Sequence, residues 1–510
     1  MQRCIRALAS LAFAGAAVLG ASTGVAQSAE RFQGILTVVW GDPPPGMAGG
    51  EERFTLTLPN GTAYPLAIAP ASQNTALHFN GKRVVVSGEA FRNGAGAEAI
   101  HVLRIAPDVS GTVAPSPPAT AAKPTLFLLL RYKDDSQEPH DPQFYLDLTN
   151  PKTPPKGSLI PATLNGFFSK TSWNQLQWQA DVGGVGGLKH TDWLTLPFGK
   201  THYANCGSSQ ACADINAIAA DGLALAVTAG INPANYSAIN FVLNNDLDCC
   251  SWGGSFIYNG TVFHGTWEAP WGQETALYAH ELGHALGLPH SGWAYYSYDS
   301  PWDVMSMGTP VKPTKCGSYS SANNGGKMET IYCSAPGDGY IAPHKDYLGW
   351  IPAANQVVLS APATKNVTLE ANSWPLTTAV KLVKICLAGQ DCSGAHAHYL
   401  TVEARLHKKS YEKGEPGDGV LVQDFQSDRG AIGGGCFFNN QSGWVVPIDA
   451  TPGDYDSKNC NSGGRKWPDY ALGNAEFAAG QTYNNGTLGV SVQVVKQNAS
   501  SFDVTVKRTK

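Results

Sequence analysis

The 510-residue sequence predicts a multidomain fold: an α/β (α+β) domain flanked by an N-terminal small β-barrel or sandwich and a C-terminal β-sandwich. Three observations predict it. Residues 31–107 show short strand patterns separated by turns, the middle of the chain alternates helical and buried-strand patterns, and residues 356–510 return to short strands. The composition, 43% hydrophobic and 15% charged, is typical of folded domains rather than of disorder.

Residues 1–26 have the pattern of a secretory signal peptide, with two arginines, an apolar run and a small-residue cleavage site. We therefore expect a secreted, extracellular protein. No later apolar run reaches 18 residues, which predicts no membrane insertion. The net charge of −5 gives no case for a nucleic-acid partner. We expect a monomer.

Residues 27–107 form the expected N-terminal β domain, a candidate pro-domain, and residues 108–123 form a Pro/Ala-rich linker. The domain has no cysteine, so it cannot place a thiolate on a metal. If it inhibits, Asp42 in the segment WGDPPPG is a candidate oxygen ligand. The alternative is a solvent-facing turn aspartate.

Residues 124–352 form the expected α/β domain. The sequence predicts buried strands in TLFLLLRY and LQWQADVGG, a helix over Cys212–Gly230 and a strand over Ile239–Asn244. A hairpin is expected over Ser251–Trp267, with its turn at Asn259-Gly260.

The segment YAHELGHALGLPHSG, residues 278–292, has the residue types and spacing of a zinc site. On a helix over Thr275–Leu286, His280 and His284 stand one turn apart and reach one metal. A helix continued to His290 would carry that residue away, so the helix must stop at Gly287, and His290 returns as the third ligand. A buried helix with incidental histidines is the alternative, but the five fixed positions make it improbable.

These residues match H-E-x-x-H-x-x-G-x-x-H, and the sequence thereby resembles the metzincin zinc metalloproteases. The resemblance implies a methionine turn beneath the metal, for which Asp303–Ser306 is the candidate, with Met305 as structural support together with Gly287. The later segment APHKDYLGW, residues 342–350, resembles the gametolysin-like family and, more loosely, the immune-inhibitor A type. His344 within it is expected to pack in a closing helix and not to bind metal.

The chemistry expected of this site is peptide hydrolysis. Three neutral imidazoles leave a fourth zinc position for water, and Glu281 is the candidate catalytic residue that takes the proton of this water. The resemblance implies that the strand before the zinc helix lines the cleft, which points to Val262–Trp267. His264 in this strand faces either the cleft or the solvent. We expect a secreted zinc endopeptidase acting on extracellular or cell-wall proteins.

Residues 353–510 are expected to form one or two β-sandwich modules. Ten cysteines follow the signal segment, an even number that predicts disulfides in an exported chain. We expect the local pairs Cys316–Cys333, Cys386–Cys392 and Cys436–Cys460. The pairing among Cys206, Cys212, Cys249 and Cys250 stays open.

Two alternatives to the endopeptidase remain. One is a secreted protein whose β modules bind a glycan or a cell surface, with a vestigial zinc site. The other is a zinc hydrolase of a non-peptide amide. The clusters Asp134-Asp135 and Asp246–Asp248 are candidates for structural calcium, with ordinary turn acids as the alternative.

Overall fold

The computed structural model describes most of the chain between residue 29 and the last residue. The described ranges are 29–43, 51–94, 96–108, 122–150, 163–183, 193–206, 210–291, 300–306, 310–394, 396–407, 410–429, 444–451 and 472–510. The expected signal peptide, most of the linker and the pair Cys436–Cys460 lie outside these ranges. No helix in the described ranges is both long and apolar enough to cross a membrane.

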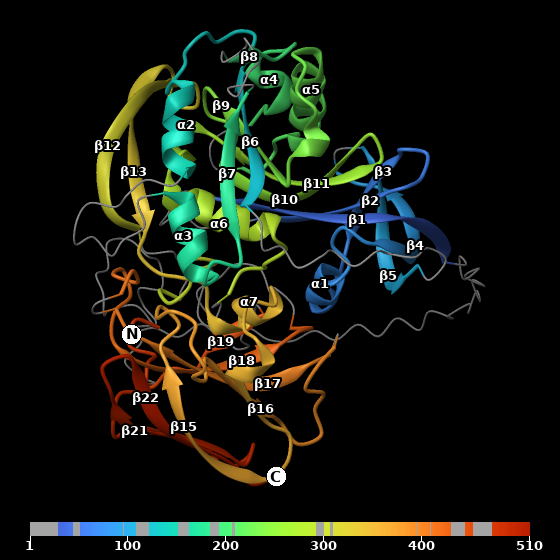
Figure 1. Cartoon of the computed structure of the whole chain (residues 1–510). Helices are drawn as coiled ribbons and strands as arrows, with labels where there is room; N and C mark the ends of the chain where they lie inside the picture. The colour runs from blue at the N-terminus through green and yellow to red at the C-terminus, as the bar shows by residue number, and fades with distance from the viewer. Residues whose placement is uncertain are drawn as a thin grey trace, which may run out of the picture.

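Strands β1 to β5 close into a small barrel (Figure 1). The strand order is β2-β3-β5-β4-β1, and the additional pairing of β1 with β2 closes the ring. With β3 parallel to β5 and a helix between β3 and β4, this is a Greek-key barrel of the OB type. Alternating β1 residues, Leu36, Val38 and Trp40, fill its core. The elements are β1 (Glu30–Asp42), β2 (Glu51–Thr57), β3 (Ala63–Ala67), α1 (Pro70–Leu77), β4 (Arg83–Arg92) and β5 (Glu98–Pro107).

The middle of the chain forms a mixed sheet in the order β10-β11-β9-β6-β7, with β8 beside β6. The apolar run of β6 serves both faces: Leu128 and Leu130 point to one core, Phe127 and Leu129 to the other. The strands are β6 (Ala122–Arg131), β7 (Gln177–Val182), β8 (Leu194–Thr195), β9 (Ala238–Leu243), β10 (Ser251–Tyr258) and β11 (Thr261–Glu268). The predicted hairpin is confirmed, since Asn259 and Gly260 take positive φ angles of 48° and 76° between β10 and β11.

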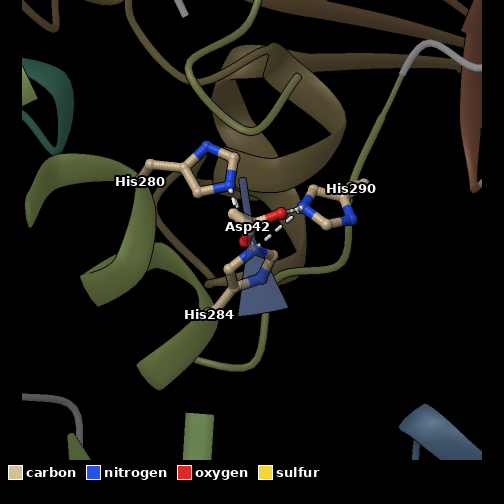
Figure 2. A group of neighbouring side chains, drawn as sticks. All are labelled: Asp42, His280, His284 and His290. Carbon is tan, nitrogen blue, oxygen red and sulfur yellow. Dashed lines mark hydrogen bonds and ion pairs between the residues drawn. The ribbon is translucent and has the colours of Figure 1, made fainter. Parts of the chain in front are cut away.

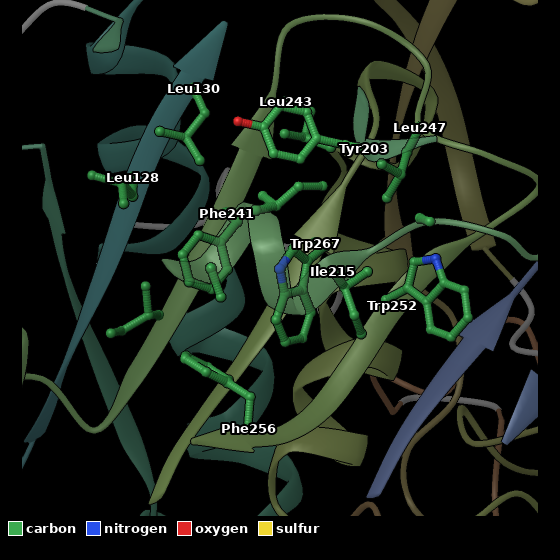
Figure 3. Close-up of a cluster of buried hydrophobic side chains, with 14 of the residues drawn as sticks. Leu128, Leu130, Tyr203, Ile215, Phe241, Leu243, Leu247, Trp252, Phe256 and Trp267 are labelled. Carbon is green, nitrogen blue, oxygen red and sulfur yellow. The ribbon is translucent and has the colours of Figure 1, made fainter. Parts of the chain in front are cut away.

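Helices cover both faces of this sheet. The core under α5 contains Phe241, Phe256 and Trp267 (Figure 3). Helices α2, α3 and α6 contribute to the core on the other face. The helices are α2 (Pro142–Thr149), α3 (Leu164–Thr171), α4 (Lys200–Tyr203), α5 (Ile215–Thr228), α6 (Thr275–Ala285) and α7 (Ala342–Tyr347), with short 3-10 turns η1 (Pro233–Asn235), η2 (Pro270–Gly272) and η3 (Ala353–Asn355).

A two-stranded ribbon, β12 (Pro310–Ser321) and β13 (Lys327–Pro336), follows the methionine-turn segment. The Gly, Ser and Asn content of Gly317–Lys327 predicts a loop, and this prediction is wrong for residues 317–321. These residues pair with β13 out to Ser321 opposite Lys327, and the ribbon is closed by the predicted disulfide Cys316–Cys333. Strand pairing and the cross-link outweigh weak local β-propensity here.

The C-terminal residues form two sheets around one core, which confirms a β-sandwich. One sheet has the order β14-β16-β17-β18-β19 and the other β15-β22-β21-β20. Their strands are β14 (Gln356–Leu359), β15 (Ala363–Glu370), β16 (Leu382–Cys386), β17 (His398–Arg405), β18 (Gly419–Gln426), β19 (Val445–Pro447), β20 (Thr482–Asn485), β21 (Val490–Gln497) and β22 (Ser501–Arg508). The disulfides are Cys206–Cys212, Cys249–Cys250, Cys316–Cys333 and Cys386–Cys392 in the described ranges, which confirms two of the expected local pairs.

The sandwich is joined to the α/β domain by buried polar contacts. The Glu403 carboxylate accepts a hydrogen bond from the backbone N–H of Ala342, the first residue of α7, at 3.1 Å. Arg405 on the same strand pairs with Glu403, Glu412 and Glu415, and all four side chains have no solvent exposure. Since buried charges need partners, this cluster constrains the whole junction.

We predict that Arg405→Met lowers the free energy of unfolding by about 3–5 kcal/mol, because it leaves buried glutamates without their cation. Urea unfolding followed by tryptophan fluorescence measures the change. Arg92→Met is the control, since the Arg92–Glu98 pair is 73% and 60% exposed and should change stability by less than about 0.5 kcal/mol. Equal effects of the two substitutions would contradict the role given to the buried cluster.

Candidate metal centre

Helix α6 and the turn that ends it bring three histidines together. The helix runs over Thr275–Ala285, and its apolar back, including Tyr278 and Leu282, is buried. Gly287 has φ +90°, the left-handed value that favours glycine. The N–H of Gly287 donates to the carbonyl of His284 at 2.8 Å, and that of Leu288 to Gly283 at 3.0 Å. This pair of bonds is the Schellman arrangement, and it turns the chain so that His290 comes back to the helix.

The three imidazoles converge through their Nε2 atoms (Figure 2). The Nε2 atom of His284 lies 3.1 Å from that of His280 and 3.1 Å from that of His290. The Nδ1 atom of His280 lies 2.5 Å from the Val304 carbonyl, and that of His284 lies 2.7 Å from the Leu288 carbonyl. A carbonyl only accepts, so Nδ1 carries the proton and Nε2 keeps its lone pair.

This donor set fits a zinc ion. Three imidazole Nε2 atoms at one point, with each ring buried and two of the rings oriented by backbone carbonyls, form the arrangement typical of zinc–histidine sites. Burial lowers the pKa of His284 to about 3, and the adjacent His290 adds to this effect. A neutral imidazole is the form that binds metal.

Met305 packs against the helix that carries His280 and His284. It is fully buried, and a Cβ added at Gly283 would lie 2.3 Å from its sulfur. Glycine at position 283 therefore lets Met305 pack directly under the helix turn between His280 and His284. The neighbouring Val304 supplies the carbonyl that orients His280.

Asp303 connects the methionine turn to two other segments. Its Oδ2 accepts a hydrogen bond from Ser291 Oγ and lies 3.0 Å from His344 Nδ1. Although burial alone would raise it, His344 and Ser291 hold the pKa of Asp303 below its usual range. His344 thus belongs to the support of the methionine turn. The contact between Asp303 and Ser291 could not be predicted from the sequence, although both residues flank motif positions.

Glu281 follows His280 in α6 and has no solvent exposure. Burial raises the pKa of the Glu281 carboxyl well above its usual range, and the carboxylates of Asp42 and Glu268 add to this effect. Neither of its carboxylate oxygens has a hydrogen-bond partner among the described residues. Strand β10 packs closely on it, since a Cβ at Gly253 would lie 2.4 Å from the Glu281 carbonyl oxygen.

Asp42, at the end of barrel strand β1, places its carboxylate among the three histidines (Figure 2). Its Oδ1 lies 2.8 Å from His290 Nε2, and its Oδ2 lies 3.1 Å from His284 Nε2 and 3.3 Å from His280 Nε2. Although burial alone would raise it, the histidines hold the pKa of Asp42 well below its usual range. Of the two roles considered from the sequence, the solvent-facing turn aspartate is wrong, because the side chain is only 4% exposed.

The prediction that Val262–Trp267 lines the cleft was wrong. Strand β11, which contains Val262–Trp267, lies between β10 and β9, whereas β10 pairs with the barrel and packs on α6. Sequence order suggested β11 because it precedes the zinc helix directly, but the hairpin folds β10 to the outside. His264 accordingly bonds Ser255 across the hairpin, with 3.0 Å between Nδ1 and Oγ.

The described acidic clusters give no support for calcium. The Asp246 carboxylate accepts hydrogen bonds from Tyr319, Ser321 and the backbone of Asn323. Asp248 accepts three backbone N–H groups and the Trp252 indole. These carboxylates hold the β12–β13 ribbon and the start of β10, and neutral donors take the oxygens that a calcium ion would need.

A helix-borne histidine pair, a third histidine beyond a glycine stop and a glutamate between them define the site of a metallopeptidase. Residues 194–382 match a family described as gametolysin peptidase M11, which confirms the resemblance to the gametolysin-like peptidases. This segment contains the three histidines, Glu281 and Met305. A comparison with curated proteins found no match.

We predict that Asp303→Ala lowers zinc affinity about 10-fold or more, because the carboxylate fixes the turn that orients His280 and the residue next to His290. Competition with a chromophoric chelator measures the affinity. The control is Glu138→Ala, which removes an exposed acid paired with Arg131 on the same domain. Unchanged zinc affinity in the Asp303 variant would show that the turn holds its shape without this carboxylate.

Proposed function

We propose that the protein is a secreted zinc-dependent endopeptidase of the metzincin type that cleaves extended segments of extracellular or cell-wall proteins. The observation that carries the proposal is the convergence of three buried imidazole Nε2 atoms, with the buried Glu281 next to His280 in the same helix. The family match over residues 194–382 supports a metallopeptidase. The signal pattern in residues 1–26 supports export.

His280, His284 and His290 would hold the ion. Bound there, zinc would polarise a peptide carbonyl and lower the pKa of a water molecule to about 7. Glu281 would take the proton of the attacking water and deliver it to the leaving amine. The raised pKa of Glu281 suits this task, because the carboxyl group would hold the proton until the amine leaves.

Strand β10 supports the choice of an extended polypeptide as the substrate. It is the outer strand of the α/β sheet, and its backbone lies directly against Glu281. A peptide that pairs with this edge would pass the three histidines, and strand addition holds a chain by its backbone whatever its sequence. The cleavage specificity then depends on side-chain pockets next to this edge.

We expect that a mixed-peptide digest gives sequenced internal cuts that a zinc chelator abolishes. Both the native chain and an Asp42→Ala chain are assayed, because Asp42 lies between the three histidines. Cuts inside peptides distinguish an endopeptidase from an amidase of non-peptide substrates. If neither chain cleaves any peptide, or if the chelator leaves cleavage unchanged, the proposal fails.

We predict that Glu281→Ala lowers peptide turnover by about 10²–10⁴-fold while one zinc ion per chain is retained, because the residue moves a proton and binds no metal. Turnover is measured in whichever of the native and Asp42→Ala chains cleaves peptides faster, and bound zinc is measured by atomic absorption. Glu138→Ala is the matched control for the loss of one carboxylate. Near-native turnover of the Glu281 variant would contradict the mechanism.

A further inference from the structure

Strand β1 of the barrel already occupies the edge at which a peptide would bind. Val39, Trp40, Gly41 and Asp42 pair antiparallel with Gly254, Gly253, Trp252 and Ser251 of β10. Figure 1 shows β1 running from the barrel alongside β10 above α6. The two domains thus share one continuous sheet, and no free edge of β10 remains over these four residues.

The contact is built by more than strand pairing. The Trp40 indole stacks on the His284 ring, with 4.6 Å between ring centroids and 10° between planes. Its Nε1–H donates to Glu52 of β2 at 3.0 Å, which fixes the ring. Trp40 is fully buried. Trp40 of the barrel therefore covers the ring of His284. Asp42, two residues further along β1 on the same side of the strand, reaches the Nε2 atoms of all three histidines.

Arg53 on β2 anchors the barrel from the other side. Its guanidinium lies 4.1 Å from the centre of the Trp252 ring and donates to the Ala213 carbonyl at 2.6 Å. The Trp252 ring also lies against Gly41, where a Cβ would come within 2.7 Å of it. Glycine is therefore required at position 41 for β1 to lie this close to β10.

The donor set explains what the carboxylate does. Catalytic zinc sites keep one position open beside three protein ligands, whereas structural sites are closed by four. Asp42 would add a fourth ligand of a type that zinc accepts, since its carboxylate reaches the point at which the three Nε2 atoms meet. The barrel has no cysteine to serve instead.

We propose that the barrel, residues 30–107, is an intramolecular inhibitor of the peptidase: Asp42 closes the fourth position of the metal, and residues 39–42 of β1 take the place of the substrate strand on β10. This inference rests on the proposed function and names the regulation of the same site. Loss of either contact then weakens the inhibition, and full activity requires that the carboxylate leave the metal and that β1 leave β10.

Binding of acetohydroxamate, a small zinc ligand, tests without an activity assay whether Asp42 closes the fourth position of the metal. Zinc-loaded full-length chains are titrated by calorimetry: the native chain, Asp42→Ala and Glu89→Ala, which removes an exposed acid of barrel strand β4. We expect Asp42→Ala to bind the probe about tenfold more tightly or better, because the competing carboxylate is gone, and Glu89→Ala to behave as the native chain. Equal affinity in all three chains would overturn the role of Asp42.

Gly41→Leu tests whether residues 39–42 replace the substrate strand, with Asp42 retained. The added side chain collides with the buried Trp252 ring and should separate β1 from β10. Backbone amides of residues 251–254 should exchange hydrogen faster, and peptide cleavage should rise about tenfold or more over that of the native chain. Unchanged exchange would overturn the strand replacement. The proposed function and the proposed inhibition fail separately. If peptide cleavage depends on Glu281 but acetohydroxamate binds equally with and without Asp42, the proposed function stands and the proposed inhibition is wrong.

Discussion

The structure depends on the reversal of the chain at Gly287. Two histidines one turn apart on a helix are common enough, but a third nitrogen reaches them only if the helix ends within one turn and the backbone folds back. The positive φ of Gly287 and the two hydrogen bonds of the Schellman arrangement accomplish this, and the same turn presents the Leu288 carbonyl to His284. One backbone feature thus places a ligand and fixes the proton of another.

Support for the three histidines extends outward in layers that cross domain boundaries. Met305 fills the space that Gly283 leaves under the helix, Asp303 ties the methionine turn to Ser291 and His344, and Glu403 of the sandwich accepts the first N–H of α7. Because His344 is part of α7, the sandwich holds the methionine turn through this helix. The C-terminal sandwich is therefore part of what keeps the histidines in place.

Local sequence predicted those parts of the molecule whose geometry is decided within about a dozen residues. The zinc helix, its stop, the hairpin at Asn259-Gly260 and two of the disulfides belong to this group. Contacts between distant segments were harder. The choice between β10 and β11 as the outer strand depends on how the hairpin lies on the sheet, and turn-rich residues 317–321 became a strand through pairing with β13. The sequence left two roles open for Asp42, a metal ligand or a solvent-facing residue. Asp42 is 238 residues away from His280 in the chain, and only strand pairing between the two domains brings them together.

The pairing of β1 with β10 also bears on how a substrate would lie. Strand β1 runs antiparallel to β10, and its side chains alternate between the metal side and the opposite side, so that Trp40 and Asp42 point to the histidines while Gly41 faces Trp252. A peptide taking the same path would meet the same alternation. Its residue opposite Trp252 would have to be small, or the Trp252 ring would have to move, whereas a residue in the place of Trp40 has room for a large aromatic side chain. The surface that holds the barrel in place therefore constrains which polypeptides can replace it.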